Sequence, residues 1–401
     1  MQIFSEAGRL NASNTNPGYT TLAAAITSSA AISISVTSAA GFPASGNYYI
    51  MVDSEQMQVT AGQGTTTWTV TRGTNGTTSA THLITAMVFQ SATTVIPIEP
   101  MFFEPKVNRY KPKLMRDSFV AFYESIIVSE TSELKSMKMP ATFEVLSWLL
   151  GYSVGPVTPT GAGPVYTWPY APTNSSDTLL GMGAEMYNDT AAYHVAALYC
   201  DQIVLDIVRG KDSALLTTDF LGQMAFQMGA KSPGLTTPLA PSASTLNLIN
   251  PAYTSLYLDD TTYGATLRND FETVKLTLKN GVQQLFFLNG VLYPTSVARA
   301  QRNLDVELIQ WFDDYTELQK AMNAVGNGTY RRIQITSNGP QIGTSGTDNS
   351  LTVKAGLYWD TFVWKPDHDI WALTLTGATV YDPNQGNDWS MSLVNGIATA
   401  P

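Results

Sequence analysis

The chain has 401 residues, of which 44% are hydrophobic, so it can form a packed core and more than one domain. Charged residues make up only 13%, against roughly 25% in ordinary soluble domains. The 32 acidic residues outnumber the 22 basic ones, and the net charge of −10 argues against a protein that grips nucleic acid through its phosphates. This balance favours a β-rich protein whose surface is largely buried by neighbours.

Cysteine usage and the N-terminal residues bear on the cellular compartment. Cys200 is the single cysteine, so no intrachain disulfide can form, and we expect it to be a small core residue. Met1–Leu10 lacks the basic and apolar regions of a secretion signal, and the sequence contains no run of some 18 apolar residues. We therefore expect assembly in a cytoplasm and no contact with a membrane.

Residues 1–19 are expected to form an N-terminal arm, and residues 20–95 a small all-β module. The module is rich in Thr, Ser, Ala and Gly, and glycine-containing turns separate its short β-branched and aromatic runs. The expected strands are Ala31–Val36, Tyr48–Val52, Glu55–Thr60 and Thr66–Thr71.

Residues 96–401 are expected to form a second, larger unit. Its first helix is predicted over Thr142–Leu150, with Thr142 as the N-cap and Gly151 as the stop. Residues 155–173 contain five prolines, so we expect them to run along a surface or across a neighbouring subunit rather than in a central strand. A second helix is predicted over Asp314–Val325, where apolar residues recur at helical spacing.

Strands dominate the rest of this unit. In Asn303–Leu308, Leu304, Val306 and Leu308 share one face while Asp305 and Glu307 share the other. The expected strands are Tyr193–Val208, Ala214–Gly222, Phe271–Leu278, Gln284–Leu288, Asn303–Phe312, Thr329–Thr336, Leu351–Val363 and Ile370–Asp382.

A search for catalytic and metal-binding patterns predicts no enzyme, no cofactor and no metal. The chain has three histidines and no HExxH, CxxC, GxSxG, phosphate-loop or dinucleotide fingerprint. Residues 367–369, Asp-His-Asp, could ligate a metal, but a polar turn between two strands explains them better. The acid pairs Asp259/Asp260 and Asp313/Asp314 are better explained by capping and solvation than by glycoside hydrolysis.

A basic run follows the proline-flanked passage at residues 96–100. Its members are Lys106, Arg109, Lys111, Lys113 and Arg116. Pro105 and Pro112 indicate an extended arm, and pairing with the acidic surface of an adjacent subunit is the favoured interpretation. Contact with DNA, helped by nearby aromatic residues, and an ordinary solvated segment remain the alternatives.

Two parts of the chain resemble bacteriophage structural proteins. The run AAGFPASGNYYIMVDSEQMQVTAG, followed by TTTWTVTRGTNGTT and His82, resembles a small β module of such proteins. From about Ile96 onward the order of elements resembles the tail tube protein of long-tailed, non-contractile phages. That resemblance rests on PATFEVLSWLLGYSVG, YHVAALYCDQIVLDIVRGKDSALLTTDFLGQ, FETVKLTLKNGVQQLFFLNG, AQRNLDVELIQWFDDYTELQKAM, LTVKAGLYWDTFVW and WALTLTGATVYDPNQGNDWSMSLVNG.

The resemblance implies a mainly β fold, a tail-tube β-sandwich or barrel with a flanking α-helix, plus the N-terminal module on the exterior. It implies a virion protein that assembles into hexameric rings stacked into a tube. The implied partners are other copies, the tail terminator, the baseplate or tail tip, and the tape measure protein. DNA would pass through the tube without being held.

Such a tube must let a polyanion slide, and acidic groups facing the lumen would prevent DNA from adhering. The candidate lumen-facing acids, for which a solvated outer face is the alternative, are Asp201, Asp206, Glu272, Asp305 and Glu307.

Two other functions fit the composition. One is another virion component, such as a head decoration or tail terminator protein. The other is a carbohydrate-binding adhesin that uses the aromatic residues Tyr166, Trp168 and Tyr170.

Overall fold

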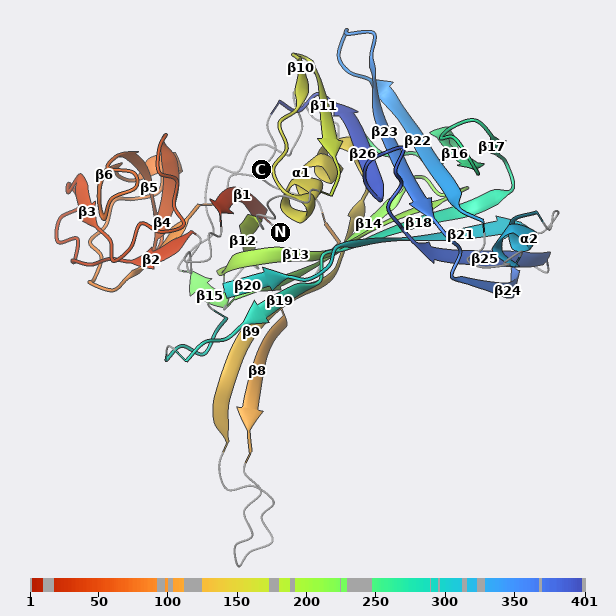
Figure 1. The fold of residues 1–401 in the computed structure, drawn as a ribbon. Coiled ribbons are helices and arrows are strands. Elements are labelled where there is room, and N and C mark those ends of the chain that lie inside the picture. Colours follow the sequence, from red (N-terminus) through yellow and green to blue (C-terminus); the bar gives the residue numbers. More distant parts are fainter. Residues whose placement is uncertain are drawn as a thin grey trace, which may run out of the picture.

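The computed structural model is mainly β, as the sequence predicts, and its sheets are antiparallel. The structure describes residues 2–9, 18–91, 98–99, 104–111, 125–172, 180–187, 192–223, 225–228, 247–288, 290–294, 296–311, 316–322, 329–367 and 370–398. Within these residues, the strands form a small sheet near the N-terminus, two large sheets and a separate two-stranded hairpin (Figure 1).

The N-terminal module is a six-stranded sheet around a small apolar core. Trp68 is fully buried there, and its ring lies edge-on to Phe42 and Tyr48 at centroid distances of 4.9 and 5.9 Å. The strand order is β2 (Tyr19–Thr21), β7 (Met87–Gln90), β4 (Tyr48–Val52), β5 (Glu55–Ala61), β6 (Thr67–Thr71) and β3 (Ser33–Ser35), with the short helix η1 (Thr74–Gly76) after β6.

The larger of the two main sheets has 11 strands. Its main path is β24 (Thr361–Asp367), β25 (Ile370–Ala378), β21 (Asn303–Trp311), β18 (Phe271–Lys279), β13 (Ala192–Val208), β14 (Leu215–Gly222), β9 (Ile126–Pro140) and β8 (Glu104–Tyr110). Both β12 (Leu180–Tyr187) and β15 (Ala225–Met228) pair with β13, and β1 (Gln2–Arg9) pairs with β12. Part of the predicted N-terminal arm is thus a strand of this sheet.

The second main sheet has seven strands and packs against the larger sheet through one shared core. Its order is β10 (Thr160–Ala162), β11 (Val165–Tyr170), β26 (Trp389–Asn395), β23 (Asp348–Leu357), β22 (Arg331–Gln341), β16 (Thr254–Asp259) and β17 (Leu267–Arg268). The short helix η2 (Pro251–Tyr253) precedes β16, and α2 (Thr316–Met322) follows β21. The separate hairpin pairs β19 (Val282–Leu285) with β20 (Ser296–Arg299).

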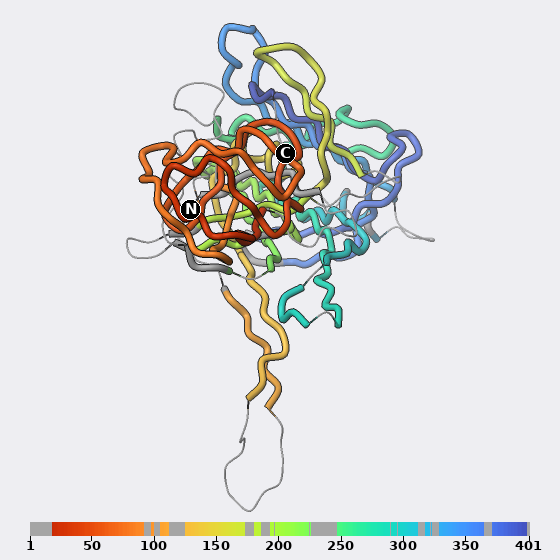
Figure 2. Tube along the Cα trace, turned by 90° about the vertical axis from the view of Figure 1, so that its left-hand side faces the viewer, coloured from red at the N-terminus to blue at the C-terminus, as the bar shows by residue number. Residues whose placement is uncertain are grey.

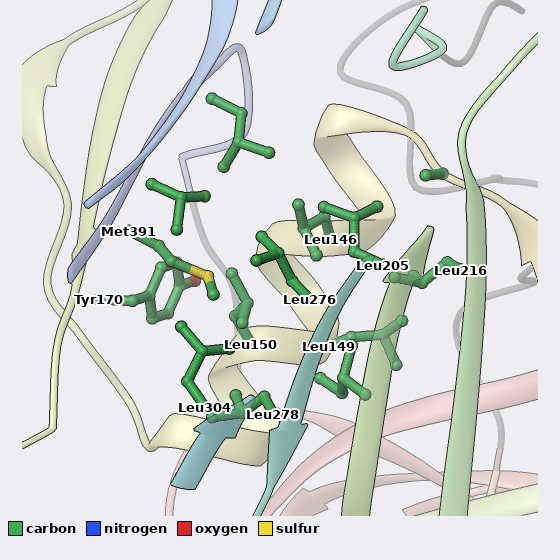
Figure 3. Packing of buried hydrophobic residues seen from close by; sticks show 14 of the residues in the cluster. Leu146, Leu149, Leu150, Tyr170, Leu205, Leu216, Leu276, Leu278, Leu304 and Met391 are labelled. Atoms are coloured by element: carbon green, nitrogen blue, oxygen red, sulfur yellow. The ribbon is translucent and has the colours of Figure 1, made fainter. Parts of the chain in front are cut away.

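Helix α1 (Phe143–Val154) lies between the two main sheets, and all of its residues are buried. The Thr142 hydroxyl accepts a hydrogen bond from the Val145 amide at 3.1 Å, so the predicted N-cap is confirmed. The predicted stop at Gly151 is wrong, because the helix continues to Val154 and ends at Gly155, whose φ of 123° suits glycine. Leu146, Leu149 and Leu150 pack against leucines of the large sheet (Figure 3).

The proline-rich passage contains more regular structure than predicted. Residues 160–170 form the hairpin β10/β11, and β11 pairs with β26. Pro169 lies opposite Ser392 of β26, beyond the last residue of β11 that pairs with β10. The N–H that proline lacks is therefore not needed for a hydrogen bond to β10. The passage therefore borders the second sheet instead of only crossing a surface.

Two predicted strands have different boundaries in the structure. The single strand expected over Leu351–Val363 is wrong, because β23 and β24 belong to different sheets and residues 358–360 connect them. The strand expected over Gln284–Leu288 lies earlier, at β19, which leaves Phe286, Phe287 and Leu288 in an exposed loop. The predicted helix over 314–325 is described only from Thr316 to Met322.

Candidate functional site: the outer face of the large sheet

The strands β13, β18 and β21 are two-sided. One side of each packs apolar residues into the shared core, and the other side carries half-buried residues in strict alternation along β21. Asp206, Lys275 and Glu307 lie directly opposite one another on three neighbouring strands of this outer face. The β-sheet period of two therefore brings together charges that are far apart in the sequence.

Two ion pairs cross neighbouring strands on this face. The Lys279 ammonium lies 2.6 Å from an Asp305 carboxylate oxygen, and the Lys275 ammonium lies 3.7 Å from Glu307. A shallow hollow of about 460 Å³ is lined by these four side chains together with Asp360. Because Asp206 stands beside Lys275 in the same register, carboxylates outnumber ammonium groups on this part of the sheet.

Asp206 is the least well compensated of these carboxylates. Its Oδ1 is buried and has no hydrogen-bond partner within the described part of the chain. Burial raises the pKa of Asp206, nearby Glu307 raises it further, and Lys275 opposes the change. The carboxylate is therefore held in a site that does not fully satisfy it.

Two of the predicted lumen-facing acids lie at β-bulges and do not line this hollow. Asp201 is the extra residue of a β-bulge between Cys200 and Gln202, and its carboxylate accepts a hydrogen bond from the Val282 amide at 2.8 Å. Glu272 is the extra residue of a second bulge, between Phe271 and Thr273, and it lines a pocket at the end of the sandwich. A bulge breaks the period of two, so the face of the sheet on which each residue lies does not follow from counting along the sequence.

The predicted basic arm is a two-stranded hairpin made by β8 and β9, which projects from the body (Figures 1 and 2). Lys106 pairs with Glu133 at the base of the hairpin, and Arg109 and Lys111 are exposed on it. Lys113 and Arg116 lie outside the described residues.

The arm also exposes apolar side chains. Val107, Tyr110, Ile126 and Val128 are all exposed, with Tyr110 opposite Ile126, whereas Val107 pairs with Glu130 on the other face of the ribbon. A two-stranded ribbon has no core of its own and is at best marginally stable in water. We therefore expect this arm to be covered by something else.

The other candidate groups have structural environments. The Asp259 carboxylate accepts hydrogen bonds from the Ala265 and Thr266 amides, and Asp260 forms ion pairs with Lys320 and Arg331. This acid pair therefore fixes a loop and neutralises two basic side chains. Within the described residues no group of three or more potential ligands could hold a metal ion, while His368 and the pair Asp313/Asp314 lie outside them. No helix in the described part of the chain is both long and apolar enough to cross a bilayer.

Of the three aromatic residues assigned to an adhesin, Tyr166 is half-buried, while Trp168 and Tyr170 are buried. Trp168 and Tyr170 are each only 1% exposed, and the Tyr170 hydroxyl donates to the Ser147 carbonyl oxygen at 2.6 Å. Both side chains belong to the core beside α1, because their alternation with Pro169 along β11 turns them inward. They cannot stack on a sugar.

Cys200 is buried, as expected, and burial raises the pKa of its thiol.

The sequence analysis missed a buried charge network in the N-terminal module. The Arg72 guanidinium donates twice to the Glu55 carboxylate, at 2.7 Å each. His82 lies between two carboxylates, 2.7 Å from Asp53 and 2.9 Å from Glu55. The only sequence signal was the spacing of His82 after the two glycine-rich turns, which says nothing about its partners.

No family model matches the chain, and no curated protein sequence is significantly similar to it.

Proposed function

We propose that this chain is a structural, non-catalytic subunit of a bacteriophage tail tube. In this proposal copies form hexameric rings, the rings stack, and DNA passes through the central channel. The observation that carries the proposal is the two-sided large sheet, whose outer face is polar and half-buried while its inner face packs the core. Such a sheet is suited to line a water-filled channel when neighbouring copies continue it.

The edges of the large sheet support this proposal. At one edge, β24 has no neighbour beyond β25 among the described strands, and it exposes Phe362 and Val363. At the other edge, β8 belongs to the projecting arm. Open edges with exposed apolar residues promote aggregation unless something pairs with them, and closure into a ring removes them.

The charges of the outer face also support it. Asp206, Asp305, Glu307 and Asp360 are accompanied by two lysines, so the face is mildly anionic. Such a face gives DNA no gain from counterion release and lets it slide. The arm, with Lys106, Arg109 and Lys111, would contact an acidic neighbour rather than DNA.

The proposal extends to partners and location. The tail terminator, the baseplate or tail tip and the tape measure protein would contact the ends and the lumen of the assembled tube, in the virion tail. The N-terminal module would lie on the exterior.

Electron microscopy of the purified protein tests the proposal. We expect hollow rods in negative stain, and a cryo-EM map in which Asp206, Asp305 and Glu307 face the lumen. Val363→Lys places a charge on the β24 edge and should abolish the rods, whereas Leu83→Lys, at an exposed position in the module, should leave them intact. A monomer under all assembly conditions, or a channel lined by lysine and arginine, would refute the tube.

A further inference from the structure

The hairpin β19/β20 carries an apolar tip with no charge. Phe286, Phe287 and Leu288 are 47%, 57% and 110% exposed, and Leu292 is 40% exposed. Between Lys279 and Arg299 the sequence has no charged residue. We call residues 286–288 the tip. Adjacent exposed residues of this size mark a binding surface more often than an ordinary solvated loop.

The tip is presented on a well-anchored base. The Gln284 side-chain amide donates to the Gly222 carbonyl oxygen at 2.7 Å, and the Gln223 side-chain amide donates to the Pro294 carbonyl oxygen at 2.8 Å. The Glu130 amide of the arm donates to the Leu292 carbonyl oxygen at 2.8 Å. A loop held at its base loses little conformational entropy when it binds.

A pocket lined by both apolar and polar residues lies between the two main sheets. It has a volume of about 680 Å³, and Ile207, Leu256, Phe271, Val274 and Trp311 supply its apolar lining. Arg209 and Glu272 also line it, and Oε2 of Glu272 is buried without a hydrogen-bond partner in the described structure. This volume lies within the range of pockets that enclose a ligand, so it can receive a few large side chains.

The tip and the pocket lie at opposite ends of the same strands. Asp201 on β13 and Lys279 on β18 are at the hairpin end, while Ile207 and Phe271 on these strands line the pocket. At about 3.3 Å per residue, six to eight residues separate the two ends by roughly 20–25 Å. Figure 1 shows β19 and β20 at one end of the sheet and β16 and β17 at the other.

We propose that the tip of one copy inserts into the inter-sheet pocket of the next copy. A projection and a cavity at opposite ends of one chain make a head-to-tail contact, which repeats without limit or closes into a ring. The inference rests on the proposed function, because it supplies the contact by which copies follow one another.

A second copy fits the tip better than a lipid bilayer does. The chain has a net charge of −10, so anionic membranes repel it, whereas the pocket of a second copy offers apolar side chains against which the tip can pack. Burial of three large apolar side chains is favourable at about 25 cal/mol for each Å² removed from water.

Disulfide trapping in assembled rods tests this contact. Leu288→Cys places a thiol at the tip, and Ala252→Cys places one in the pocket lining, while native Cys200 is buried and cannot compete. The double variant should give a ladder of covalent dimers, trimers and longer oligomers after mild oxidation. The matched control combines Leu288→Cys with Leu83→Cys, an equally accessible position in the N-terminal module. It should give no ladder.

The outcomes separate the inference from the proposed function. Rods that give no ladder, or equal ladders in both variants, would overturn the tip contact but would not contradict the proposed tail tube. Wild-type protein that never self-associates would overturn both. Phe287→Asp should reduce rod formation at least tenfold without changing the circular dichroism of the monomer. Wild-type sedimentation with phosphatidylglycerol vesicles that Phe287→Asp abolishes would assign the tip to lipid instead.

Discussion

Glu55 in the N-terminal module is buried and Asp206 on the large sheet is half-buried, and the two carboxylates differ in proton affinity. Hydrogen bonds from Arg72, His82 and the Ala80 and Gly73 amides outweigh burial at Glu55 and lower its pKa to about 2. At Asp206, loss of solvation by burial raises the pKa and nearby Glu307 adds to the rise, because Lys275 opposes it only in part and one carboxylate oxygen has no hydrogen-bond partner within the described residues.

This difference in pKa distinguishes two kinds of site. Glu55 belongs to a network that stabilises the fold, whereas Asp206 lies on a surface whose polar groups are not all paired within the single chain. In the module, both carboxylate oxygens of Glu55 have hydrogen-bond partners within the described residues, so the network stabilises the fold without a second chain. On the sheet, the partially compensated face destabilises the isolated chain slightly. Sites of the second kind are where function or assembly is to be sought.

The largest expected effect comes from removing the module carboxylate. Glu55→Ala leaves Arg72 and His82 buried without their shared partner, and we expect a loss of about 3–5 kcal/mol in the stability of the module. Hydrogen exchange of the β4 and β5 amides measures this loss. Asp53→Asn is the matched control, because the Asp53 side chain is 58% exposed and its loss should cost less than about 1 kcal/mol. Equal losses would mean that the network does not hold the module.

Acid titration should give an intermediate effect. Because folding lowers the pKa of Glu55, its contribution to stability is complete above the ordinary value of 4.5 and disappears as pH falls from there towards about 2. Thermal unfolding of the module should therefore shift to lower temperature across this interval. The shift should be much smaller in Glu55→Ala, and an unchanged slope in that variant would contradict the assignment.

The smallest expected effect is at Asp206. Its raised pKa means that the folded chain binds the proton more tightly, so its carboxylate costs stability once pH exceeds the ordinary value of 3.8. Asp206→Asn should raise the stability of the monomeric chain at neutral pH by about 0.5 kcal/mol in urea unfolding. Asp305→Asn, which removes the ion pair with Lys279, should give no gain. A loss at Asp206 would show that the site is fully compensated.

Local patterns in the sequence predicted much of the fold. Alternation along Asn303–Leu308 placed Asp305 and Glu307 on the same outer face, and the Thr142 cap gave the start of α1. The β4 strand, Tyr48–Val52, has the predicted bounds, because tight turns on both sides limit it.

The errors arose where tertiary structure overrides a local period. The extra residues at Asp201 and Glu272 shift the register of β13 and β18, and no composition marks a bulge in advance. Gly151 is accommodated inside a helix that packing holds on every side, so a glycine did not end it there. The sequence also could not reveal that Trp168 packs beside α1, because that contact joins distant segments.

The position of β26 has a consequence for the order of folding. Asn395 on β26 donates to the Phe143 carbonyl oxygen and accepts from the Trp168 indole, so this strand joins α1 and β11 across more than 220 residues of sequence. The module, by contrast, is complete within residues 19–90. On a translating ribosome the module can reach its native state early, while the two-sheet body stays open until residues 389–395 emerge. Slow closure of the body would delay self-association until each copy is finished.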